Sequence, residues 1–316
     1  MPKVAEDVRP LRHAGMRLMK RTTRLSGAFV LFTILFLFSG AAGLIYEVVW
    51  ERLLAVYFGV TMTSVTLIVS AYMAGLGLGS LFGGRIARGL RSVLVSYGLL
   101  EIGIGVFGLA SPRLLGLIGR STAGSPYWLV FVLSFAFLLL PTFLMGMTLP
   151  ILAQAFIRRV ESSGQVIGAL YGINTLGAAL GSALAAYVLI GKLGFDGASA
   201  VAVAINLGVA FVAIAAARFV PSDRAAQITS AETAGPAAKC TYAEILIAAA
   251  LVGFIGLGFE MLWIRVLHIV NKNTSYGFAS ILCVFLIGLA IGGFLWGRRA
   301  DRSKDPEQLF WQLEVQ

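Results

Sequence analysis

The chain has 316 residues, of which 58% are hydrophobic and only 13% charged, with a formal net charge of +10 and two cysteines. An ordinary soluble domain has about 25% charged residues, so this composition excludes a typical soluble fold. The two cysteines exclude a disulfide framework, and the basic residues lie in short loops between apolar runs, which argues against a nucleic-acid-binding patch.

Eight apolar runs are long enough to cross a bilayer as helices, which takes about 20 residues each. In chain order we expect helices over 27–57, 62–84, 92–111, 127–157, 164–191, 197–217, 243–270 and 275–297. Residues 112–126, which mix Pro112 and two arginines with leucines, predict an outer loop with a short interfacial helix. A ninth apolar stretch begins near Leu309 and stops at Gln316, so we expect a truncated chain or a fragment of a longer protein.

Basic residues alternate along the loops in a way that predicts orientation. The N-terminal segment has seven lysines and arginines against Glu6 and Asp7, and the loops after the second, fourth, sixth and eighth helices are also basic. By the positive-inside rule the N-terminus is cytoplasmic and the protein is a multi-pass protein of the bacterial inner (plasma) membrane. A secretory signal peptide ending near Ser39–Ala41 is the alternative, but the apolar run continues past that point.

An internal repeat organises the chain. Residues 43–101 align with residues 256–314 at a constant offset of 213, with 16 identities in 59 positions. Long internal repeats are typical of transporter folds. Among the identities are Glu47 and Glu260, Trp50 and Trp263, and Arg52 and Arg265.

Because six helices separate the two copies, both have the same orientation, as in a parallel six-plus-six repeat. We therefore predict an all-α polytopic membrane protein of major-facilitator-like design, truncated after about eight helices. The loop Gly297–Arg302 resembles the facilitator loop motif, with Asp301 as its acidic residue, whereas Arg88 takes that place in the first copy. The predicted parts are a basic N-terminal segment (1–25), a first membrane half (26–217), a cytoplasmic linker (218–242) and an incomplete second half (243–316, repeating 30–103).

Three segments carry a narrower resemblance: Ser39–Trp50, Leu140–Pro150 and Leu170–Gly177. They resemble the membrane part of fused facilitator/spermidine-synthase-like proteins, over nearly the whole chain from about residue 26. In that family a soluble aminopropyltransferase-like domain follows the helices and transfers aminopropyl from decarboxylated S-adenosylmethionine to putrescine.

No strand, glycine-rich turn and helix of a nucleoside-binding domain follows in this sequence, so the resemblance leaves enzymatic activity of this chain open. The expected function is the membrane module of such a fusion, which presents or conducts a polyamine or related cation. The alternatives are a free-standing secondary transporter and a non-transporting scaffold. The expected partners are the lipid bilayer, a fused or associated aminopropyltransferase domain and a small cation, with no nucleic acid. No cofactor is expected in this chain, and decarboxylated S-adenosylmethionine only with a fused catalytic domain.

Acidic residues within apolar helices are costly, so they are paired, protonated or functional. Glu47 and Glu260 each precede Trp by three residues and Arg by five. One interpretation is an end anchor, in which each Glu meets Arg52 or Arg265 while Trp50 and Trp263 lie in the interfacial belt. The other is a polar pair that lines a central cavity.

Two further polar residues and one helix complete the candidate site. Glu101 falls near the middle of the third helix, either as a protonated hydrogen-bonding group or as a proton or cation site. Asn174 bonds a neighbouring helix or contacts substrate. Pro141, Gly146 and Pro150 predict kinks in the fourth helix, which then lines a cavity. No cluster with metal-ligand spacing occurs, so no metal is expected.

Overall fold

The computed structural model describes residues 8–58, 61–157, 163–219, 242–270 and 276–303, together with the isolated residues 308, 309 and 312. This part of the chain is helical and contains no strand. The helices are α1 (Val8–Phe58), α2 (Thr61–Ala87), α3 (Val93–Ser121), α4 (Tyr127–Phe156), α5 (Ser163–Leu184), α6 (Ile190–Ala217), α7 (Tyr242–Val270) and α8 (Gly277–Arg302), with a π-helical turn η2 (Ala185–Leu189) between α5 and α6.

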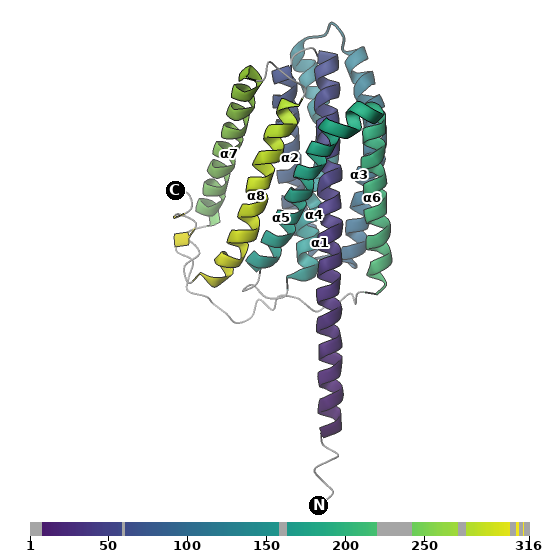
Figure 1. Ribbon diagram of the computed structural model, residues 1–316, viewed down its shortest axis with the longest axis vertical. Helices are drawn as coiled ribbons and strands as arrows, with labels where there is room; N and C mark the ends of the chain where they lie inside the picture. Colours follow the sequence, from purple (N-terminus) through teal and green to yellow (C-terminus); the bar gives the residue numbers. More distant parts are fainter. Residues whose placement is uncertain are drawn as a thin grey trace, which may run out of the picture.

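The helices form one bundle with α1 running through it (Figure 1). At 1.5 Å per residue the 51 residues of α1 span about 77 Å, more than twice the thickness of the hydrocarbon core of a bilayer. The N-terminal part of α1 therefore projects beyond the bundle, so the predicted basic segment continues the first helix from Val8 onward.

Seven described segments are long and apolar enough to cross a membrane, which confirms the prediction of a polytopic α-helical membrane protein. The longest, Ser163–Ala217, has 55 residues and contains both α5 and α6. It turns back at Gly194, whose φ of 69° lies in the left-handed region that glycine adopts without strain. The sequence predicted this connection between residues 191 and 197. The predicted ninth stretch and most of the predicted linker lie outside the described residues.

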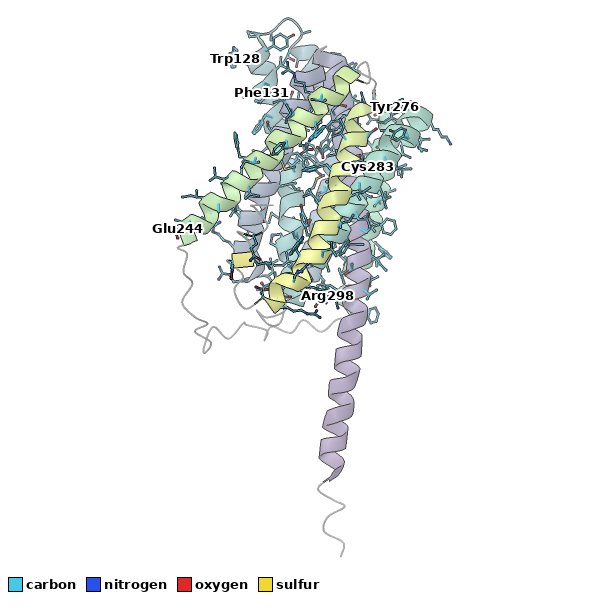
Figure 2. All side chains as sticks on the ribbon, turned by 60° about the vertical axis from the view of Figure 1, so that its left-hand side comes forward. Trp128, Phe131, Glu244, Tyr276, Cys283 and Arg298 are labelled. Carbon is cyan, nitrogen blue, oxygen red and sulfur yellow. The ribbon has the colours of Figure 1, made fainter. Side chains whose placement is uncertain are left out.

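The two copies of the repeat run in the same direction. Figure 2 shows Arg298 of α8 at the end of the bundle from which the α1 extension projects, and Glu244, near the start of α7, in the half of the bundle toward that end. Trp128 and Tyr276 lie at the opposite end. This arrangement agrees with a parallel repeat.

The prediction for residues 112–126 is wrong. Helix α3 continues through Pro112 to Ser121, and no separate interfacial helix forms there. Proline lacks an N–H, which would leave the carbonyl of Gly108 without its helical donor. The Ser111 hydroxyl donates a hydrogen bond to that carbonyl at 2.9 Å, so the helix tolerates the proline.

Glycines bring the helices of the site into backbone contact. On α5, Gly177 and Gly181 lie against the carbonyl groups of Leu37 and Ala41 in α1. On α2, Gly75 lies against Thr142 and Gly79 against the carbonyl group of Phe143, both in α4. Small residues allow such close approach in membrane bundles, and here they place one face of α1 beside α5.

Candidate functional site

A cavity of about 310 Å³ lies between helices of both repeat copies, at the small end of the range for ligand pockets. Helices α1, α2, α4 and α5 contribute from the first half, and α7 and α8 from the second. Its wall consists of Ser39, Gly40, Gly43, Leu44, Glu47, Val69, Tyr72, Met73, Leu76, Met145, Thr148, Tyr171, Asn174, Thr175, Ala178, Glu260, Leu282, Phe285, Leu286 and Leu289.

The two repeat-related carboxyl groups, Glu47 and Glu260, both line this cavity, although only 3% and 2% of their surfaces are exposed. Glu260 is close enough to interact electrostatically with Glu47. One carboxyl oxygen of Glu260, Oε2, is buried and accepts no hydrogen bond from the described part of the chain. Both carboxyl groups thus lie on a cavity wall, and their action as a polar pair stays a prediction.

The expected Glu–Arg anchors do not form. Arg52 instead pairs with the adjacent Glu51, its Nε lying 3.3 Å from a Glu51 carboxylate oxygen. Arg265 is exposed, and no ion pair joins it to Glu260 within the described residues. The reason is helical geometry: residues five apart in a helix differ by about 140° in direction, so the arginines turn away from the cavity.

Trp50 is not an interfacial anchor. It is fully buried, its indole N–H donates to the Ser111 hydroxyl at 2.8 Å, and its ring stacks on Tyr46 at 5.6 Å between centroids. Its repeat counterpart Trp263 is 56% exposed on α7, where an interfacial position stays a prediction. The same motif therefore has two environments, because α3 covers Trp50 and no described helix covers Trp263.

Helix α4 lines the cavity, but with residues other than the predicted ones. Met145 and Thr148 line the wall, whereas Pro141, Gly146 and Pro150 do not. Pro141 and Pro150 lie inside a continuous helix, and Gly146 packs against the backbone of Leu76 in α2. Gly146 is thus a contact point between α2 and α4.

Asn174 makes the predicted hydrogen bond to a neighbouring helix, whereas contact with a substrate stays a prediction. Its side-chain amide donates to the carbonyl of Phe36 in α1 at 2.9 Å, and the residue also lines the cavity. Gly40 on α1 faces the Asn174 backbone, which leaves no room for a larger residue.

Glu101 lies outside the cavity wall and is fully buried between α1, α3 and α6. Its carboxyl group accepts hydrogen bonds from the Ser39 hydroxyl at 2.6 Å and the Asn206 amide at 2.5 Å. The Asn206 carbonyl oxygen in turn accepts from the Tyr46 hydroxyl at 3.1 Å.

Sequence reasoning missed three residues here. Asn206 is an isolated amide within the apolar run of α6, so the argument used for Glu101 would have found it. Ser39 and Tyr72 carry no comparable signal, because single hydroxyl groups are common in membrane helices.

Asp301 at the end of α8 caps α5. Its carboxylate oxygens accept the backbone N–H groups of Gly164 and Gln165 at 2.8 and 2.7 Å. A carboxylate at a helix N-terminus satisfies free donors and opposes the positive end of the helix dipole. Asp301, predicted in a loop, thus lies in the last turn of α8 and ties the second copy of the repeat to the first half.

Comparison with known proteins agrees with this architecture. The chain is 29% identical over 174 residues to polyamine aminopropyltransferase 2 of Streptomyces coelicolor, a match covering 54% of this chain and 29% of that protein. No solved structure matches the chain. The model of the Major Facilitator Superfamily matches residues 26–312, nearly the whole chain. The protein therefore belongs to the Major Facilitator Superfamily.

Proposed function

We propose that this facilitator-type bundle binds a small organic cation with several amino groups, such as a polyamine, in the cavity between its two halves. The observation that carries the proposal is the placement of Glu47 and Glu260 on one cavity wall. No lysine, arginine or histidine is among the described lining residues, so the cavity offers carboxylates without a resident counter-ion. Buried carboxylates in a membrane bundle are stabilised by a cation or a proton.

The chemical class of the cation rests on two supports. The relative from Streptomyces coelicolor is named as a polyamine aminopropyltransferase, and the match covers 29% of its length. The motifs Ser39–Trp50, Leu140–Pro150 and Leu170–Gly177 resemble the membrane part of spermidine-synthase-like fusions. We propose that the bundle presents or conducts a polyamine for aminopropyl transfer by a fused or associated domain, with the N-terminus in the cytoplasm and the bundle in the inner membrane.

The test is equilibrium binding of radiolabelled spermidine to the purified protein in lipid nanodiscs. Replacing Glu47 or Glu260 by Gln should weaken binding by roughly tenfold or more, since a charge-assisted hydrogen bond contributes about 1.5–3 kcal/mol. Glu244→Gln is the matched control, because it removes the same charge from the exposed start of α7. Equal affinity in all four proteins, or no binding by any, would refute the cation site.

The same preparation separates the alternatives. Spermidine uptake into proteoliposomes that is lost in Glu47→Gln identifies a transporter. Binding without uptake, together with aminopropyl transfer to putrescine in native membranes, identifies a presenting module. If the protein shows neither spermidine binding nor spermidine uptake, the remaining alternative is a membrane scaffold.

A further inference from the structure

Glu101 is a buried carboxyl group that the proposed cation site does not use. Its two oxygens accept hydrogen bonds from neutral donors, Ser39 of α1 and Asn206 of α6. The titratable groups near enough to interact with it are Tyr46 of α1 and Tyr97 of α3. Among the described residues no cationic group interacts with it.

The charged residues of the surrounding helices lie elsewhere. Asp196 of α6 precedes Asn206 by ten residues, about 15 Å along the helix, and Lys192 lies beyond the turn at Gly194. Helix α4, which also packs against α3, has no charged side chain within Tyr127–Phe156. The carboxyl group is therefore solvated by neutral hydrogen-bond donors alone within the described part of the bundle.

Ser39 connects this group to the cavity. It lies on the cavity wall, on the same face of α1 as Glu47, and its hydroxyl is 2.6 Å from Glu101 Oε1. That distance suits a hydrogen bond in either direction, from Ser39 to a carboxylate or from a carboxylic acid to Ser39. A residue that lines the cavity, and whose hydroxyl group reaches a buried carboxyl group, can act as a one-residue proton relay.

We propose that Glu101 is a proton-exchange site that communicates with the cavity through the Ser39 hydroxyl. On release, the O–H bond at Glu101 Oε1 breaks and its proton forms an O–H bond at Ser39 Oγ, while Ser39 passes its own proton to a water molecule in the cavity. Uptake reverses both transfers. In the anionic state Ser39 and Asn206 donate to the two carboxylate oxygens, and in the neutral state Glu101 donates to Ser39.

The neighbourhood accommodates both states. The Tyr97 hydroxyl, buried one turn before Glu101 on the same helix, makes no hydrogen bond of acceptable geometry with the described residues and is close enough to interact with the carboxyl group. It is a spare donor for the anion. Asn206 is itself held by the Tyr46 hydroxyl, which fixes its amide toward Glu101. A coupling of proton exchange to cation binding rests on the proposed function. The proton exchange itself does not rest on it.

The test is infrared difference spectroscopy of the purified protein in lipid, recorded without polyamine. The carboxylic acid C=O band of Glu101, identified by its loss in Glu101→Gln, should disappear reversibly as pH rises and shift in D₂O as the proton is exchanged. Ser39→Ala should retain the band and slow its exchange by roughly a hundredfold, because a positioned proton-transfer group typically contributes about that much.

Thr33→Ala is the matched control on α1, since the Thr33 hydroxyl binds the Phe29 carbonyl one turn away and should leave the exchange unchanged. A band that persists at every pH at which the protein stays folded, or one never seen at any such pH, would overturn the exchange site. Exchange in Ser39→Ala as fast as in the wild type would overturn the route. Glu47→Gln and Glu260→Gln should keep the Glu101 band, so failure of the cation site leaves this readout intact.

Discussion

At the scale of single residues, tertiary contacts separate acidic groups that look alike in sequence. Glu47 and Glu51 are one helical turn apart on α1 and both buried, yet Glu47 lines the cavity while Glu51 pairs with Arg52. Glu101 is fully buried away from the cavity wall, and neutral donors satisfy both of its oxygens. The carboxyl groups thus have three different chemical environments in one bundle.

The Asn206 amide joins Glu101 to Tyr46, so removing it should destabilise the bundle. Asn206→Ala leaves a carboxyl oxygen and a tyrosine hydroxyl without their partners, at a cost of about 1–3 kcal/mol. We expect the variant to aggregate at a lower temperature than the wild type when heated in detergent, as measured by size-exclusion chromatography. Ser199→Ala on the same helix is the control: its buried hydroxyl has no hydrogen-bond partner within the described residues, so its removal should be neutral or stabilising. Equal effects of the two substitutions would refute this account of the network.

At the scale of helices, glycine positions decide which elements meet. The cavity face of α1 exists because α5 crosses it closely, and this crossing depends on Gly177 and Gly181. The glycines at corresponding repeat positions of α2 and α8 differ in their contacts. Gly75 and Gly79 touch α4, whereas a β-carbon added at Gly288 or Gly292 would meet no described atom within 4 Å.

A methyl group at Gly177 should separate α5 from α1. Its β-carbon would overlap the Leu37 carbonyl group, a backbone atom that cannot move aside alone. Overpacking of this kind costs about 1–3 kcal/mol. Gly177→Ala should therefore lower thermal stability in detergent and weaken the proposed binding of spermidine.

Gly208→Ala on α6 is the control for that substitution, because its β-carbon meets no described atom within 4 Å. Alanine stabilises a helix relative to glycine by about 1 kcal/mol, so this variant should be equal to or more stable than the wild type. If Gly177→Ala proves as stable as Gly208→Ala, the close crossing of α1 and α5 is wrong.

At the scale of the whole molecule, the described helices place the N-terminal extension and the Arg298 end of α8 on one side of the bundle (Figure 2). The turn that contains Gly89 follows α2, and the turn that contains Ser125 follows α3. Successive helices end on opposite sides, so these two turns face opposite compartments.

Single cysteines can test the proposed orientation. In a background with Cys240 and Cys283 replaced by Ser, Ser125→Cys should react with a membrane-impermeant maleimide in intact cells. Gly89→Cys should react only after the cells are permeabilised, because the proposed orientation places the basic loops in the cytoplasm. The reverse pattern would invert the topology, and labelling of both residues in intact cells would contradict the bundle.

The sequence by itself determined the spans, the repeat and the fold class. Apolar runs of membrane length and a periodic excess of basic loop residues are local properties, and a fixed offset of 213 needs only an alignment. It also located Glu47, Glu101 and Glu260, since a charge within an apolar run is visible without any structure. The sequence predicted too short a third helix, because the hydrogen bond from the Ser111 hydroxyl to the Gly108 carbonyl, which compensates for Pro112, is visible only in the structure.

Only the tertiary structure decided what each polar residue faces. Trp50 and Trp263 share one motif, but one is buried by α3 and the other is exposed. Asn206 meets Glu101 across 105 positions in the sequence, and Asp301 caps α5 across 137. Hydrophobicity determines that a segment enters the membrane, but it does not determine the rotation of the helix about its own axis. The rotation is set by close contacts between neighbouring helices, and these contacts bring both repeat-related carboxyl groups to a single cavity.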